Sequence, residues 1–526
     1  MELTGKNIIG GGLSGDGKTT FFAVNPATGE NIAPKFNEAT VEEINAAIDK
    51  ATEAFQTYRN KSGEEKAIFL ETIADEILSL GDDLIQRCMK ESGLPEARLV
   101  GERGRTMSQL KLFAQVLREG SWVDARIDYA DPDRKPLPKA DIRSMLRPLG
   151  PVGIFGASNF PLAFSVAGGD TASALAAGCT VVVKGHPAHP GTSEMVGMAI
   201  RAAVKKCNMP EGTFSLVHGA SIEVGQTIVR HPSIKAIGFT GSFRGGKSLF
   251  DEAAKREEPI PVYAEMGSTN PVFILPRALK AKKESIAQDL SASVNLGVGQ
   301  FCTNPGLVFL EASDEEVHFR TLLAEKMGAS DPGVMLTKGI RDSYNTGIEN
   351  LTKVKGVRVL AEGKKETSAC YGSSYLLHAP ANTFLEEPVL QEEVFGPSTV
   401  AVTADSKSEL MAAAKKLHGH LTITIHGTEE DLEEHKDLIE LLEQKAGRLT
   451  INGYPTGVEV CHAMVHGGPF PATTDSRTTS VGTGAIFRFA RPVCYQNYPQ
   501  SLLPEELKNE NPLNIMRLVD GNYKRA

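Results

Sequence analysis

The chain has 526 residues, 41% of them hydrophobic and 23% charged, which is the composition of an ordinary globular protein. A chain of this length is too long for a single hydrophobic core, so we expect two or three domains. The 56 basic and 65 acidic residues give a net charge of −9, which offers no basic surplus to meet a phosphate backbone. We therefore exclude nucleic acid as the main partner and expect chemistry on a small molecule.

The distribution of apolar residues and cysteines indicates the compartment. The amino terminus lacks a basic stretch followed by an apolar run, and no run of about 18 apolar residues occurs, so we expect neither export nor a membrane partner. Seven cysteines without a CxxC pair are typical of free thiols in a reducing environment. The predicted localisation is cytoplasmic.

Residues 11–20 read GGLSGDGKTT and contain the GxxxxGK[ST] pattern of a phosphate-binding loop. That pattern binds phosphate only between a buried strand and a helix. The preceding residues are too few and too polar for such a strand, and Pro26 and Gly29 would break a helix that begins at Lys18. We interpret residues 12–19 as the turn of a hairpin; an ATP-binding P-loop protein is the alternative.

Two capping boxes predict helices in the first hundred residues. Thr40 with Glu43, and Ser62 with Glu65, each precede apolar residues at helical spacing, and Gly81 is expected to end the second helix.

From residue 151 onward, short apolar runs such as VGIF, CTVVVK and FSLVHG alternate with stretches of small residues. Continuous apolar runs separated by helices predict a parallel sheet covered on both faces, and a similar α/β pattern starts near residue 270. The fold class is therefore α/β with a doubly wound, Rossmann-like domain. Ligands of such domains bind beyond the carboxyl ends of the strands.

Three residues near strand ends are candidates for chemistry. Cys302, in GQFCTNPG, has small and polar neighbours, so its thiolate is a candidate nucleophile, with a packed core thiol as the alternative. Glu265 follows an apolar run, where a salt-bridged surface carboxylate is equally typical. Asn159, in FGASNFP, offers an amide to an oxyanion or forms an Asx turn.

Taken together, the strings NPATGE, GASNFP, VVVKGHPAHPGTSE, GFTGS, AEMGSTNP, GQFCTNPG and EEVFGP resemble the aldehyde dehydrogenase superfamily over nearly the whole chain. The resemblance implies that Cys302 attacks an aldehyde, that Asn159 helps to hold the oxyanion, and that Glu265 activates water to hydrolyse the thioester. It also implies NAD(P)-dependent oxidation of an aldehyde to a carboxylate.

The same resemblance assigns the cofactor site. It places Lys184 near the adenosine ribose, Gly241 and Ser242 beside the pyrophosphate, and Glu393 with Phe395 near the nicotinamide ribose. Many NAD-preferring members carry a glutamate where this chain has Pro187. Without that carboxylate a 2′-phosphate is not repelled, and Lys184 or His186 can attract it, so NADP is the expected cofactor and NAD the alternative.

The strings KGHPAHPGTSE and GSTNP resemble those of enzymes that oxidise 2,5-dioxovalerate (α-ketoglutarate semialdehyde) and of NADP-linked bacterial fatty aldehyde dehydrogenases. A substrate with a distal carboxylate needs a cation, for which Arg103 and Arg105 are candidates; exposed helix residues are the alternative. For a fatty aldehyde the tunnel should be apolar throughout. In either case we expect the ring-bearing residues Phe160, Phe164 and Phe301 to line it.

The resemblance also implies the domain organisation. We expect a cofactor domain at 1–127 and 150–264 with 448–484 packing on it, a catalytic domain at 265–447, and an oligomerisation segment at 128–149 and 485–504. The expected assembly is a homodimer or homotetramer.

Three alternatives are a metal site, a protein without catalytic activity, and an enzyme that transfers the acyl group to coenzyme A. His186 with His189, and Cys461 with His462 and His466, could suggest metal ligands, but we interpret them as loop residues and expect no metal. A catalytically silent binding protein would not need Asn159, Glu265 and Cys302 together. A CoA-acylating enzyme is the nearer alternative, against which Glu265 favours hydrolysis.

Overall fold

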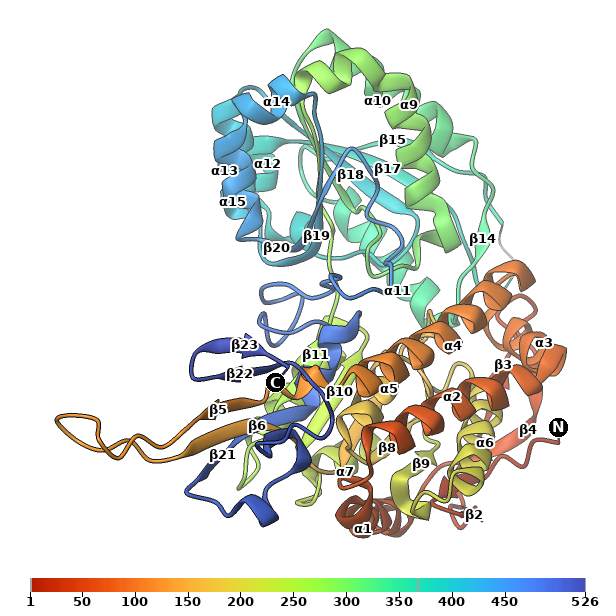
Figure 1. Cartoon of the computed structure of the whole chain (residues 1–526). Coiled ribbons are helices and arrows are strands. Elements are labelled where there is room, and N and C mark those ends of the chain that lie inside the picture. The colour runs from red at the N-terminus through yellow and green to blue at the C-terminus, as the bar shows by residue number, and fades with distance from the viewer. Residues whose placement is uncertain (1, 367–368, 526) are drawn as a thin grey trace.

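The protein, described here from a computed structural model covering residues 2–366 and 369–525, consists of two lobes that are each built on a seven-stranded sheet (Figure 1). The amino-terminal residues form one lobe, and the residues from about 270 to 451 form the other. Within the described parts of the chain, none of the helices combines the length and apolar character that a bilayer crossing requires.

The sheet of the first lobe has five parallel strands, and β7 lies at its centre. In spatial order the strands are β11 (Val262–Glu265), β10 (Ala236–Thr240), β7 (Val152–Phe155), β8 (Val181–Lys184), β9 (Phe214–Val217), β1 (Asn7–Ile9) and β2 (Gly12–Ser14). Because the chain runs outward from β7 to β9 and then returns to β10 on the other side of β7, a ligand crevice is expected at the carboxyl ends of the central strands. The predicted doubly wound α/β domain is confirmed.

Helices pack on both faces of this sheet. They are α1 (Val41–Tyr58), α2 (Gly63–Ser79), α3 (Gly81–Ser92), α4 (Glu96–Glu119), α5 (Gly169–Ala177), α6 (Pro190–Lys206), α7 (Ile222–Arg230) and α8 (Phe243–Ala254). Both predicted capping boxes are present at Thr40 and Ser62. The second helix ends just before Gly81 as predicted, but α3 begins at that same glycine.

The amino-terminal GxxxxGK[ST] string is not a phosphate-binding loop. Its first residues form β2, which pairs antiparallel with β1, and β3 (Thr20–Val24) follows it where a P-loop needs a helix. Lys18 is exposed. The predicted hairpin exists, but its turn lies at Gly10 and Gly11, so the prediction that residues 12–19 form the turn was wrong.

The second lobe contains a sheet that is parallel except for its edge strand β15. In spatial order the strands are β15 (Arg358–Glu362), β17 (Tyr375–Pro380), β18 (Ser398–Ala404), β13 (Leu307–Glu311), β12 (Val272–Ile274), β19 (His420–His426) and β20 (Ala446–Ile451). Its helices are α9 (Pro276–Asn295), α10 (Asp314–Gly328), α11 (Lys338–Thr352), α12 (Ala381–Glu386), α13 (Lys407–Lys416), α14 (Glu429–Glu434) and α15 (Lys436–Glu443). The expected domain boundary at 447 falls inside β20.

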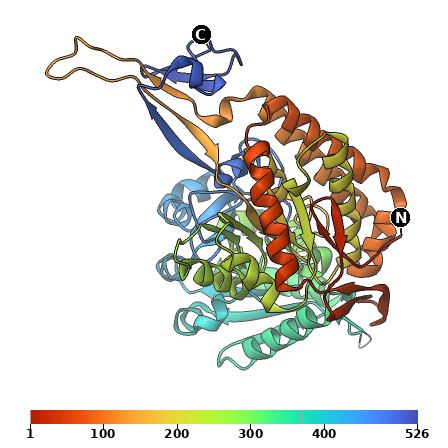
Figure 2. The same ribbon diagram turned by 90° about the horizontal axis from the view of Figure 1, so that it is seen from below.

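A third sheet projects outward from the first lobe (Figure 2). Its strands are β21 (Ala490–Gln496), β6 (Ile142–Pro148), β5 (Arg126–Asp128), β22 (Arg517–Val519) and β23 (Asn522–Lys524). The connection between β5 and β6 projects furthest from the molecule. The chain therefore pairs its own excursion with its own late strand, and residues 517–524 extend this sheet beyond the segment that we expected.

After β20 the chain crosses back from the second lobe to the first. Residues 452–482 contain no helix or strand, and within them the Ala472 carbonyl accepts a hydrogen bond from the Met266 amide at 2.8 Å. The Ala264 amide donates to the Thr474 hydroxyl at 2.9 Å. This crossing segment, residues 452–482, thus lies along the end of β11.

Candidate functional site

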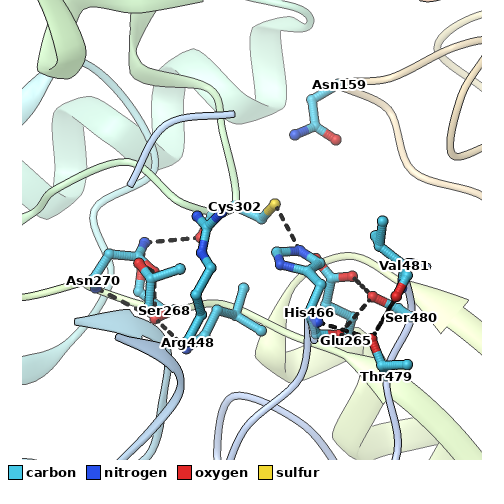
Figure 3. A network of polar contacts seen from close by, with 12 residues as sticks. Asn159, Glu265, Ser268, Asn270, Cys302, Arg448, His466, Thr479, Ser480 and Val481 are labelled. Atoms are coloured by element: carbon cyan, nitrogen blue, oxygen red, sulfur yellow. Dashed lines mark hydrogen bonds and ion pairs between the residues drawn. The ribbon is translucent and has the colours of Figure 1, made fainter. Parts of the chain in front are cut away.

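Three side chains from distant parts of the chain meet between the lobes. Oε1 of Glu265, at the end of β11, lies 2.8 Å from Nε2 of His466, and the same nitrogen lies 3.4 Å from Sγ of Cys302 (Figure 3). Glu265 and His466 are almost fully buried, at 3% and 1% exposure. One imidazole nitrogen therefore stands between the thiol and the carboxylate.

The crossing segment fixes this arrangement. The Ser480 hydroxyl donates to Oε2 of Glu265 at 2.5 Å and so leaves Oε1 to face His466. The His466 amide donates to the Thr479 hydroxyl at 2.8 Å, and the His466 carbonyl accepts from the Ser480 amide at 2.8 Å. On the other side, Nδ2 of Asn270 donates to the Cys302 carbonyl at 2.8 Å and holds the loop that carries the thiol.

The charges of the site keep the thiol protonated and the carboxylate ionised. Burial, and then the negative charge of Glu265, raise the pKa of Cys302 well above its usual value. Burial alone would raise the pKa of Glu265, but the adjacent His466 and the hydrogen bonds from His466 and Ser480 outweigh it and lower the pKa. The resting site therefore holds a thiol beside an available base.

Asn159 follows β7 and lies on the other side of the Cys302 sulfur from Glu265 (Figure 3). Its side-chain Nδ2 donates to the Gln300 carbonyl at 3.0 Å, and its backbone carbonyl accepts from Nη2 of Arg98 at 2.7 Å. A carboxamide nitrogen carries two hydrogens, and the Gln300 contact uses one of them.

The predicted aromatic residues cluster next to this asparagine. The Phe160 ring makes edge contacts with Phe164 and Phe301, at centroid distances of 5.1 and 5.4 Å. The Arg105 guanidinium lies 5.1 Å from the Phe164 centroid, and that of Arg98 lies 4.7 Å from the Phe301 centroid. The cluster thus combines apolar walls with two cations.

The two predicted arginines do not share this location. Nη1 of Arg103 donates to the Gly81 carbonyl at 2.8 Å, at the junction of α2 and α3. Because side chains two positions apart point to different sides of a helix, Arg103 cannot face the aromatic cluster together with Arg105. The expectation that Arg103 lines the substrate entrance was wrong; Arg98, seven positions before Arg105 on α4, lies there instead.

The residues expected at the adenosine end of the cofactor lie around the end of β8. Lys184 is mostly buried, and this burial lowers its pKa to about 8 although the charge of Glu38 opposes the shift. Glu38 comes from the connection between β4 (Asn31–Asn37) and α1, and its Oε2 accepts hydrogen bonds from the amides of Ala220 and Ser221, at 2.8 and 2.9 Å. A carboxylate that the sequence did not reveal therefore lies close to Lys184.

The surroundings of His186 oppose a positive charge on its ring. Burial, and then the charges of His189 and Lys184, lower its pKa well below the usual value. Its ring stacks on that of His189 at a centroid distance of 5.4 Å. That His186 attracts a 2′-phosphate by its charge stays a prediction, which this lowered pKa disfavours.

The residues expected at the pyrophosphate and nicotinamide positions lie at other strand ends. Gly241 and Ser242 are exposed at the start of α8, where Ser242 caps the helix by accepting from the Gly245 amide at 3.2 Å. The Glu393 carboxylate lies so close to Gly267 that a Cβ there would fall 2.2 Å from Oε2. Burial raises the pKa of Glu393 to about 7, with the Ser268 amide opposing. Phe395 lies two residues further along the same segment.

Of the other candidate metal ligands, His189 and His462 lie outside the cluster of Glu265 and Cys302, whereas His466 belongs to it. His189 is fully buried, with ring contacts to the Ala157 carbonyl at 3.0 Å and the Ser193 hydroxyl at 3.3 Å. Nδ1 of His462 lies 3.4 Å from the Thr483 hydroxyl. His466 lies in a loop as expected, but it also contacts Glu265 and Cys302, which was not predicted from the sequence.

The fold and the arrangement of thiol, carboxylate and amide define a family. A profile of the aldehyde dehydrogenase family matches residues 13–470, and the chain belongs to that family. It is 51% identical to alpha-ketoglutaric semialdehyde dehydrogenase 2 of Azospirillum brasilense over 99% of both chains. It is 47% identical to alpha-ketoglutaric semialdehyde dehydrogenase of Acinetobacter baylyi, again over 99% of both. Among solved structures, an NAD+ complex of aldehyde dehydrogenase from Bacillus cereus superposes with a TM-score of 0.79 at 23% identity, covering 93% of this chain and 96% of that one. The protein is thus an aldehyde dehydrogenase, and members of its family use NAD(P).

Proposed function

We propose that this protein oxidises 2,5-dioxovalerate to 2-oxoglutarate with a nicotinamide dinucleotide. The two relatives at about half identity carry that activity in their names. The structural observation that supports a distal carboxylate is Arg105: its Nε and Nη2 are buried and have no hydrogen-bond partner among the described residues. These two atoms form the edge of a guanidinium that pairs with a carboxylate by two parallel bonds.

A fatty aldehyde would leave these donors unsatisfied. Arg105 lies near Cys302. Burial lowers the pKa of Arg105, and among the nearby charges a Cys302 thiolate does most to raise it. Nη1 of Arg98 is a further buried donor that lacks a partner among the described residues. A five-carbon substrate whose aldehyde reaches Cys302 would place its carboxylate toward these arginines, and each charge-assisted bond would contribute about 1.5–3 kcal/mol.

The first chemical step requires a thiolate. Nε2 of His466 passes its hydrogen to Oε1 of Glu265 and takes the thiol hydrogen of Cys302 in its place, which the distances of 2.8 and 3.4 Å allow. The thiolate then attacks the aldehyde carbon, and the carbonyl oxygen becomes an oxyanion. The remaining N–H of the Asn159 amide and the Cys302 backbone amide hold that oxyanion, and such donors are typically worth about 3–4 kcal/mol each.

The second step produces a thioester on Cys302. The bound dinucleotide supplies the acceptor for the hydride that leaves the aldehyde carbon. Once Glu265 has released its proton to solvent, its carboxylate takes a proton from water, which attacks the thioester and releases the carboxylic acid and the thiol. Glu265 at this position favours water over coenzyme A as the acyl acceptor.

For the dinucleotide we propose that Lys184 lies at the adenosine ribose, Gly241 and Ser242 at the pyrophosphate, and Glu393 with Phe395 at the nicotinamide ribose. The exposed start of α8 supports this because a helix amino terminus binds phosphate through its free amides. We propose NADP as the preferred form, since Pro187 supplies no carboxylate. Glu38, held by two backbone amides beside Lys184, limits that preference.

We further propose a cytoplasmic homo-oligomer, a dimer or a tetramer, in which the sheet of β5, β6 and β21 contacts a second subunit. The projecting connection between β5 and β6 supports this because it packs on neither lobe (Figure 2). Light scattering of the full chain, compared with a variant shortened in that connection, tests the proposal: a monomer in both cases would contradict it.

The decisive experiment is a panel of aldehydes assayed with NAD+ and NADP+ in parallel. Matched chains of five carbons, 2,5-dioxovalerate and pentanal, differ at the end that would meet Arg105. We expect kcat/KM to be at least about 10²-fold higher for the acid than for pentanal. A bidentate pair with Arg105 would stabilise the bound acid by about 3 kcal/mol or more, and about 1.4 kcal/mol corresponds to each tenfold change. A preference for long apolar aldehydes would instead establish the fatty aldehyde alternative.

A further inference from the structure

The cluster of Glu265, Cys302 and His466 has the composition of a metal site. One oxygen, one sulfur and one nitrogen from these residues all lie within 4.8 Å of one another. They come from β11, from the loop before β13 and from the crossing segment, so that three separate parts of the chain converge on one point. Thiolate, imidazole and carboxylate are the three ligand types that proteins use for zinc.

Two of the three distances between the ligand atoms lie close to those around a tetrahedral ion, and the third, from the Cys302 sulfur to the Glu265 oxygen, is no more than 4.8 Å. Zinc bonds of about 2.0–2.3 Å at tetrahedral angles separate a nitrogen from a sulfur ligand by about 3.5 Å, and a nitrogen from an oxygen ligand by about 3.3 Å. The Cys302 sulfur already lies 3.4 Å from Nε2 of His466. The Glu265 oxygen, at 2.8 Å from that nitrogen, would have to retreat by about half an ångström.

The burial of the site also favours a dication. Glu265 and His466 are 3% and 1% exposed, so a thiolate and a carboxylate that bind here would be anions held away from water. A bound dication offsets their charge. Ser480, which donates to Oε2 of Glu265, keeps Oε1 directed at the position that the ion would occupy.

We propose that Glu265, Cys302 and His466 bind one Zn²⁺ per chain, with water at the fourth position, and that this binding reversibly blocks the enzyme. The Cys302 proton goes to solvent, the imidazole hydrogen resides on Nδ1, and Nε2, Sγ and Oε1 each donate an electron pair to the ion, so that nothing is oxidised or reduced. Inhibition follows because the sulfur pair that would attack the aldehyde is bound to the metal. This consequence rests on the proposed function; the binding itself does not.

The site should bind zinc more weakly than a structural zinc site. A metal-binding imidazole is usually held by a hydrogen bond from its other ring nitrogen, but Nδ1 of His466 is buried without a partner among the described residues. The site also offers three protein ligands where a structural zinc site has four. Chelators should therefore remove the metal and restore activity.

Calorimetric titration of the chelator-treated full chain with ZnCl₂, without substrate, tests binding directly. We expect one Zn²⁺ per chain, at least a tenfold weaker affinity in His466→Asn, and loss of this site in Cys302→Ser. Cobalt in place of zinc should give a thiolate-to-metal absorption band that Cys302→Ser removes. The matched control is the double variant Cys461→Ala, His462→Asn, whose cysteine and histidine lie outside the cluster and which should bind as the parent does.

The outcomes separate the metal site from the proposed function. Equal zinc affinity in the parent, His466→Asn and Cys302→Ser, each with an unchanged melting temperature, would overturn the metal site. Stoichiometric binding that depends on these residues in a protein without activity on 2,5-dioxovalerate would retain the metal site and overturn the proposed substrate. In the active enzyme, inhibition by zinc should disappear after addition of EDTA.

Discussion

Nε2 of His466 lies 2.8 Å from Oε1 of Glu265, although 201 positions separate the two residues in the chain. This contact gives the ionised carboxylate a hydrogen-bonded partner inside a buried site, where an isolated charge would be costly. It also makes the pKa of the carboxylate depend on the imidazole, because His466 makes the largest contribution that lowers it. The chemistry of Cys302 is therefore tuned from the crossing segment.

Glu265→Gln should slow both halves of the reaction. The amide can neither receive the hydrogen that His466 passes on nor take a proton from water, so we expect the acyl-enzyme to form more slowly and then to persist, with turnover about 10²–10⁴-fold slower than in the parent. Rapid mixing would detect the slower first release of reduced dinucleotide, and mass spectrometry would detect the acyl group on the protein. Cys302→Ala is the control, since it should give neither reduced dinucleotide nor adduct; an active Cys302→Ala protein would exclude the mechanism.

His466→Asn should change the pH profile and not only the rate. Without the imidazole, the pKa of Glu265 is expected to rise, because the contribution that most strongly opposes burial is gone. A higher pKa means that the carboxylate becomes protonated at a higher pH, so the acid limb of kcat/KM should shift toward neutrality. Activity should fall more at pH 6 than at pH 9. A uniform loss at every pH would indicate a purely structural role.

Arg105→Met tests the carboxylate partner. We expect kcat/KM for 2,5-dioxovalerate to fall by about 10²-fold or more, which corresponds to about 2.7 kcal/mol or more, while kcat/KM for pentanal stays the same or rises. Arg103→Met is the matched control on the same helix, because Arg103 donates to the Gly81 carbonyl away from the aromatic cluster. Equal losses for both aldehydes in Arg105→Met would show that the arginine acts only on the fold.

Glu38→Gln and Lys184→Met should move cofactor preference in opposite directions. Removing the carboxylate near Lys184 should raise the ratio of kcat/KM for NADP+ to that for NAD+ by about three- to tenfold, as expected for one like charge at an intermediate dielectric. Removing the lysine should lower the ratio. Glu42→Gln, at an exposed position in the first turn of α1, is the control. A ratio that neither Glu38→Gln nor Lys184→Met changes would place the 2′-phosphate elsewhere.

Much of the fold follows from local patterns. The apolar runs that form β7, β8, β9 and β10 predict a parallel sheet because strands buried on both faces need apolar side chains at every position. The capping boxes predict the starts of α1 and α2, because each pairs residues only three positions apart through reciprocal hydrogen bonds. The strands β22 and β23 are only three residues each, and their place in the third sheet depends on the pairing of β22 with β5 and of β23 with β22, which is not visible locally.

The candidate site was partly predictable. Cys302 and Asn159 stand in recognisable strings, but His466 stands in a segment without a helical or strand pattern. Its role arises from the crossing of residues 452–482 to β11, a long-range contact that no local pattern encodes. Arg98 was missed for a similar reason: one position along a helix decides which face a side chain occupies, and Arg103 and Arg105 looked equivalent in the sequence.

The crossing segment also sets the order in which the site is completed during synthesis. Ribosomes release Glu265 and Cys302 long before His466 and Ser480, which belong to the last part of the chain. Until that segment is made and docked on β11, the thiol lacks the nitrogen that links it to its base. A prematurely terminated chain would therefore carry the nucleophile without the means to activate it.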